Sequence, residues 1–167
     1  MTEEGLELDN ALWRFSCAVY AAPGVAESCL GLQDRHSADV NLLLLAAWLG
    51  AARGARLDAA AIAGLPGASW QETVIGPLRA ARRSVKARGT GDPALKEFHA
   101  QILASELAAE RIRQAALFRW AEPRFPARPA VAGLARANLA LLTGDPPAAS
   151  AALNRLAQAA EAYRPEG

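Results

Sequence analysis

The chain has 167 residues, enough for one domain with a sizeable core, because a chain near this length buries roughly 70% of its unfolded surface. Its 18 Lys and Arg residues nearly balance its 17 Asp and Glu residues, which gives a net charge of +1. Such a balance argues against nucleic-acid and membrane-surface binders, since both need a strongly basic surface. Alanine makes up about a quarter of the chain and aromatic residues only 6%, which favours helix over sheet. We therefore predict an all-α protein with a single domain over residues 1–167.

The acidic N-terminus, MTEEGLELDN, lacks the basic and apolar regions of a secretory signal, so we expect a cytoplasmic protein. The strongest apolar run, residues 40–52, is well short of the roughly 20 residues that a membrane-spanning helix needs. Because its faces are nearly all apolar, we expect it to be the central helix of the bundle. Cys17 and Cys29 are expected to be unpaired, since disulfides are rare in a reducing compartment.

Capping residues and breaks divide the chain into about six to eight helices. Asp9 is placed to cap a first helix, which ends before Pro23, and a second helix runs out near Asp34. Either Ser37 or Asp39 then caps the central helix. These signals predict three helices within the first third of the chain.

The middle and last parts of the chain predict longer elements. Ser69-Trp70-Gln71-Glu72 has the spacing of a capping box, and Gly76-Pro77 should kink or restart the helix that follows. Asp92-Pro93 starts a long helix that reaches about Ala121. A C-terminal helical hairpin follows, which we expect to pack on the long helix; its two helices span residues 131–142 and 148–163.

Polar residues adjoin the start of the central helix, and an arginine of the first helix can reach toward them. The set comprises Arg14, Asp34, His36, Asp39 and Asn41. A histidine with two carboxylates can bind a divalent metal or form an acid–base pair, and Arg14 can hold an anionic ligand. If these side chains converge, they form a small-molecule or metal site.

Alternatively, the residues of this polar set have structural roles and form no ligand site. Asp39 can cap the central helix, Asp34 can pair with Arg14 or Arg35, and His36 can lie in a loop. Motifs such as HExxH or CxxC, which would favour a chemical role, do not occur in the sequence. We assign no catalytic residue, metal ion or cofactor, and we regard the structural alternative as the more common one for such residues.

Four basic residues recur at helical spacing and share one face: Arg79, Arg82, Arg83 and Lys86. This face can bind an acidic protein partner or, more weakly, the phosphates of RNA. The near-neutral charge and the few aromatics disfavour nucleic acid. Alternatively, glutamates of the long helix satisfy the face internally: Glu97, Glu106 and Glu110.

Large aromatic side chains also leave two interpretations open: Trp13, Phe15, Tyr20, Trp48 and Trp70. They can line a ligand pocket, or they can fill the gaps that alanine-rich helices leave between them. The second is the more common use of aromatics in a small bundle.

Several motifs in the first half of the chain resemble an uncharacterised family of small proteobacterial proteins. They include Leu12-Trp13-Arg14-Phe15-Ser16, Asp39-Val40-Asn41-Leu42-Leu43-Leu44, and Pro77-Leu78-Arg79. The resemblance covers roughly residues 10–90 and implies that the helices of this part form the functional unit. It implies no activity, and residues 92–167 fall outside it.

These observations predict a non-enzymatic interaction or adaptor protein, because the charged residues form a helix face while catalytic groups do not gather. The expected partner is an acidic protein at the face from Arg79 to Lys86. The alternatives are small-molecule or metal binding by the polar set, with or without catalysis, and weak RNA binding. The sequence does not predict an oligomeric state.

Overall fold

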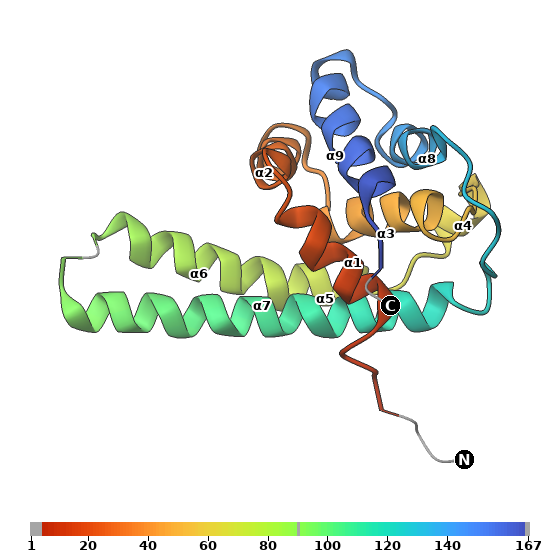
Figure 1. The fold of residues 1–167 in the computed structure, drawn as a ribbon. Helices are drawn as coiled ribbons and strands as arrows, with labels where there is room; N and C mark the ends of the chain where they lie inside the picture. The colour runs from red at the N-terminus through yellow and green to blue at the C-terminus, as the bar shows by residue number, and fades with distance from the viewer. Residues whose placement is uncertain (1–4, 90, 166–167) are drawn as a thin grey trace.

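The computed structural model describes residues 5–89 and 91–165, and the ends of the predicted domain lie outside this part. The structure is 71% helical and has no strands among the described residues, which confirms the all-α prediction (Figure 1). A π-helical stretch, Gln71–Ile75, joins the short helix Ala68–Trp70 to the helix Gly76–Ala87, so these three segments form one continuous helix among the eight of the described residues. The helices are α1 (Ala11–Tyr20), α2 (Val25–His36), α3 (Val40–Ala51), α4 (Ala59–Ala63), α5 (Ala68–Trp70), α6 (Gly76–Ala87), α7 (Pro93–Ala121), α8 (Leu134–Thr143) and α9 (Ser150–Ala162).

Helix α3 lies at the centre, as its apolar sequence predicted. Its buried residues include Asn41 and the whole stretch from Leu43 to Gly50. A Cβ atom at Gly50 would clash with the backbone of Ala135, so the glycine allows α8 to approach α3 closely. Buried Asn138 joins the same elements, because its side chain donates to the carbonyls of Ala46 and Ala55.

Two helical hairpins lie on opposite sides of α3 (Figure 1). Helices α6 and α7 form the first, and α1 and α3 pack on the middle and C-terminal part of α7. Helices α8 and α9 form the second and pack on α3 and α2. The prediction that the C-terminal hairpin packs on the long helix was therefore wrong. A helix that is apolar all round needs cover on every face, and α8 and α9 cover the side of α3 that faces away from α7.

Most helix boundaries follow their predicted caps. Asp39 accepts hydrogen bonds from the backbone of Asn41 and Leu42, and Asp92 accepts one from Ala94. The cap of α1 is Asn10, one residue after the predicted Asp9.

The capping box predicted at Ser69 is not formed. Gly67, in the left-handed conformation, precedes α5, and the Ser69 carbonyl accepts a bond from the Thr73 hydroxyl. Ser69 therefore lies inside the helix, not at its cap. Helix α6 then begins at Gly76, where the wider π turn accommodates the missing N–H of Pro77.

Within the described residues, no single helix combines the length and the apolarity that a membrane crossing requires. Helices α1 and α2 meet that composition only as a pair, and the pair is bent by 97°.

Candidate functional site

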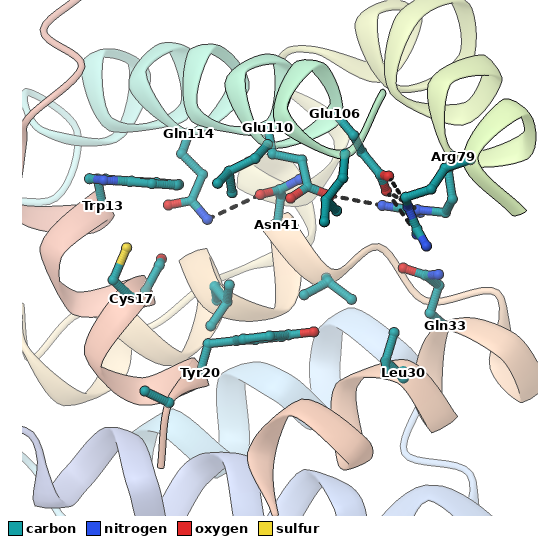
Figure 2. Close-up of a pocket in the computed structure, with 17 residues that line it drawn as sticks. Trp13, Cys17, Tyr20, Leu30, Gln33, Asn41, Arg79, Glu106, Glu110 and Gln114 are labelled. Carbon is teal, nitrogen blue, oxygen red and sulfur yellow. Dashed lines mark hydrogen bonds and ion pairs between the residues drawn. The ribbon is translucent and has the colours of Figure 1, made fainter. Parts of the chain in front are cut away.

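A cavity of about 510 Å³ opens between α1, α2 and α3 on one side and α6 and α7 on the other (Figure 2). It exists because α2 turns away from α1 at Gly24, whereas α7 continues straight past both helices. Most of its wall is apolar, including Trp13, Tyr20, Leu30, Leu44, Leu103 and Leu107. Three of these leucines are about half exposed: Leu30 (46%), Leu103 (48%) and Leu107 (52%). The cavity therefore presents apolar surface that the fold leaves uncovered.

Buried amides and a hydroxyl form one polar end of this cavity. The Gln114 side chain donates from Nε2 to Oδ1 of Asn41 at 3.0 Å, and Figure 2 shows this pair between Trp13 and Glu110. Gln114 is 2% exposed and Ser16 is 3% exposed. The Oε1 atom of Gln114 and the Oγ atom of Ser16 both lack a hydrogen-bond partner in the structure. Buried polar atoms are normally satisfied, so these two atoms, on residues that line the cavity, have unused bonding capacity just beneath its surface.

Ion pairs between α6 and α7 form the other polar end, which begins at Glu110, one helical turn before Gln114 on α7. Arg79 donates to Oε1 of Glu106 at 3.0 Å and to Oε1 of Glu110 at 2.9 Å. Arg82 binds both carboxylate oxygens of Glu106, which is almost fully buried. Two positive and two negative charges thus neutralise each other, and this end of the cavity has no net charge.

The surroundings of the two glutamates shift their pKa values in opposite directions. Burial raises the pKa of Glu110 above its ordinary value; Arg79 opposes this effect and the charge of Glu106 adds to it. Burial also acts to raise the pKa of Glu106, but hydrogen bonds from Arg82 and Arg79 outweigh it and hold the pKa below the ordinary value. Glu106 is therefore readily ionised and holds Arg79 and Arg82 in place, whereas Glu110 is ionised less readily.

The other titratable groups at the cavity stay protonated at neutral pH. Burial raises the pKa of the Tyr20 hydroxyl, and burial likewise raises the pKa of the Cys17 thiol, with Arg111 opposing it. Both cysteines are free, and burial raises the pKa of Cys29 to about 12. Protonated thiols are poor nucleophiles, so these groups suit hydrogen bonding better than covalent attack.

The structure does not bring together the five residues of the predicted polar site. Arg14 pairs with Asp9, Asp34 pairs with Arg83, and Asp39 pairs with Arg113 while it caps α3; none of these partners belongs to the set. His36 and Asp39 both line a second, smaller hollow of about 270 Å³ beside α2 and α3. Of the five, Asn41 alone lines the larger cavity. The reason is that α2 continues to His36, which separates Asp34 from Asp39.

Across residues 5–89 and 91–165, no three side chains of His, Cys, Asp or Glu gather closely enough to hold a metal ion.

The predicted basic face is divided between internal pairs and solvent. Arg79 and Arg82 are turned toward α7 and paired with Glu106 and Glu110, as the structural alternative proposed. Arg83 is exposed and pairs with Asp34, and Lys86 is exposed. Binding of an acidic partner stays a prediction, and the exposed part of the face that it would use is now reduced to Arg83 and Lys86.

Sequence reasoning placed Glu106 and Glu110 beside the arginines but missed the other residues that α7 contributes to the cavity: Leu103, Leu107 and Gln114. The available signal was a pair of leucines and a pair of glutamates, each spaced by four residues: Leu103 and Leu107, and Glu106 and Glu110. Such spacing predicts adjoining apolar and acidic strips on one helix, but not that the apolar strip stays uncovered. Trp13 and Tyr20 line the cavity, whereas Phe15 and Trp48 are buried in the core.

The fold and the cavity define an all-α protein with a mainly apolar cavity that has one uncharged and one charge-neutralised polar end. The chain belongs to the family described as "Protein of unknown function (DUF2390)", whose model matches residues 11–117. The predicted resemblance is confirmed, and the match extends beyond residue 90 through most of α7. It includes both sides of the cavity, from Trp13 to Gln114, and leaves α8 and α9 outside. We found no match to the chain among curated proteins or among solved structures.

Proposed function

We propose that this protein is a non-enzymatic binding protein that takes an amphipathic small molecule into the cavity between α1, α2, α3 and α7. The observation that carries the proposal is the combination of an uncovered apolar wall with two buried, unpartnered polar atoms, on Ser16 and Gln114. Small-molecule sites are typically concave, mostly apolar and about 300–1,000 Å³ in volume, with a few polar groups that orient the ligand. A volume of about 510 Å³ lies within that range.

The unpartnered atoms favour an occupied state on energetic grounds. A buried polar group without a hydrogen bond costs about 1–3 kcal/mol, and a ligand that bonds to it recovers this cost. The half-exposed leucines add to the gain, because a ligand removes their apolar surface from water. The unpartnered atoms and the half-exposed leucines belong to the same cavity, which is why we favour a ligand there over one at the smaller hollow.

Binding is better supported than catalysis by the chemistry of the wall. The charges of Arg79 and Arg82 are used in pairs with glutamates, and the Cys17 thiol stays protonated. Small-molecule binding was the alternative role predicted from the sequence, and its proposed site moves from the polar set to the cavity. Protein interaction at the arginine face stays a prediction.

Fluorescence of N-phenyl-1-naphthylamine, an uncharged probe that brightens in apolar surroundings, tests the proposal. The wild-type protein should bind about one probe molecule with saturation. Leu107→Trp should place an indole ring in the cavity and weaken binding roughly tenfold or more, because the larger side chain takes part of the probe's space.

The control for this experiment is Leu141→Trp, on α8. Leu141 is 48% exposed, close to the 52% of Leu107, but it lies outside the cavity wall. This variant should bind the probe like the wild type. Absence of saturable binding, or equal loss in both variants, would contradict the proposed site.

A further inference from the structure

We infer that the ligand of this cavity has an uncharged hydrogen-bonding head, such as a carboxamide or a hydroxyl group, on an apolar body. The inference rests on the proposed function and names the chemical class of the ligand. It follows from three properties of the wall: the buried amide pair, the neutralised charges, and the distance between polar and apolar surfaces.

The amide pair sets the chemistry of the head. In the structure, Gln114 donates to Asn41 and its own Oε1 is left as an unpartnered acceptor. If both amides rotate by half a turn, their roles exchange and Gln114 presents an N–H donor instead. A carboxamide or hydroxyl head satisfies either arrangement, because it both donates and accepts. The Ser16 hydroxyl also donates and accepts, and it too is unpartnered.

The charges of the wall disfavour a charged head. Arg79 and Arg82 already bind Glu106 and Glu110, so the cavity has no spare countercharge. A carboxylate head would approach Glu110, and an ammonium head would compete with Arg79 for it. Removing an ion from water without a partner costs far more than removing a neutral polar group.

The distance along α7 between Gln114 and the half-exposed leucines sets the length of the ligand's apolar body. Leu107 precedes Gln114 by seven residues on α7, which is about 10 Å at 1.5 Å per residue. The half-exposed Leu107 therefore lies about two helical turns from Gln114, whereas Leu103 lies about three turns away. An alkyl chain such as octyl, with its head at Gln114 and Ser16, reaches Leu107.

A matched set of octyl compounds tests the inference by displacement of bound N-phenyl-1-naphthylamine: octanamide, 1-octanol, octanoate and octylammonium. The four share one chain and differ only in the head. Octanamide and 1-octanol should displace the probe at concentrations roughly tenfold lower than the two ions, because only the ions lose hydration without gaining a countercharge.

Ser16→Ala identifies the place where the head binds. The variant should bind octanamide roughly fivefold more weakly, which corresponds to the loss of one hydrogen bond, and its binding of octanoate should not change. The control is Ser28→Ala, since Ser28 is also a buried helical serine but bonds to the Gly24 carbonyl and does not line the cavity. Gln114→Met, which keeps the side-chain length, serves as a second variant of the polar end.

Three other outcomes would each contradict a specific part of the proposal. If an ion displaces the probe as well as octanamide does, the uncharged head is wrong while the cavity stands. If the preference for octanamide survives both Ser16→Ala and Gln114→Met, the head lies elsewhere and the inference fails. If no compound binds, the probe included, the proposed function fails together with it.

Discussion

At the scale of single residues, the structure separates polar side chains that stabilise the fold from those that do not. Asn138 and Asp39 have their bonds completed within the protein. Ser16 and Gln114 do not, although both are almost fully buried. We interpret the second pair as groups kept for a ligand, at some expense to the stability of the empty protein.

The Ser16→Ala variant measures directly how much stability the unpartnered hydroxyl costs the empty protein. Removing a buried hydroxyl without a partner should raise the free energy of unfolding of the ligand-free protein by about 1 kcal/mol. Urea unfolding of the variant and the wild type at neutral pH gives the comparison. Ser28→Ala, whose hydroxyl is bonded, should instead be neutral or destabilising. A loss of stability in Ser16→Ala would mean that the hydroxyl has a partner in the protein.

At the scale of elements, the ion pairs between α6 and α7 make this hairpin sensitive to acid. The pKa of Glu106 lies below its ordinary value of 4.5 in the folded protein. Glu106 therefore contributes stability above about pH 4.5, and this contribution is lost as pH falls through the lowered pKa. The raised pKa of Glu110 acts in the opposite sense, so its contribution is present at low pH and is lost as pH rises through the raised value.

Glu106→Gln should therefore lower the free energy of unfolding by about 1–3 kcal/mol at neutral pH and flatten its decline in acid. Glu110→Gln, at a neighbouring position of the same helix, should cost less than about 1 kcal/mol, because its carboxylate is ionised less readily. Urea unfolding between pH 3 and pH 7 measures both variants. Similar losses in the two would show that Glu106 does not organise the pair of arginines.

The sequence was sufficient for most elements but not for their packing. Caps at Asp39 and Asp92 and the apolar run of α3 are local signals, and each predicted its element correctly. The contacts of α8 and α9 depend on long-range packing, which periodicity does not contain, so the predicted position of the hairpin was wrong.

At the scale of the whole molecule, the cavity results from how the helices are arranged. Helix α2 is bent 97° from α1, and α7 extends beyond the point where they diverge (Figure 1). Tyr20 and Gln114 are far apart in the sequence and meet at the cavity only through this arrangement. The predicted polar set was assembled from nearby residues, and the fold gave most of its members separate ion-pair partners.

An NMR titration with octanamide that follows the side-chain amide signals of asparagine and glutamine shows directly whether the head of the ligand binds at Gln114 and Asn41. The signals of Gln114 and Asn41 should shift with saturation, because the head binds at their pair. The signal of Asn138, a buried amide bonded to Ala46 and Ala55 away from the cavity, should stay unchanged. Saturable binding that leaves Gln114 and Asn41 unshifted would contradict the account.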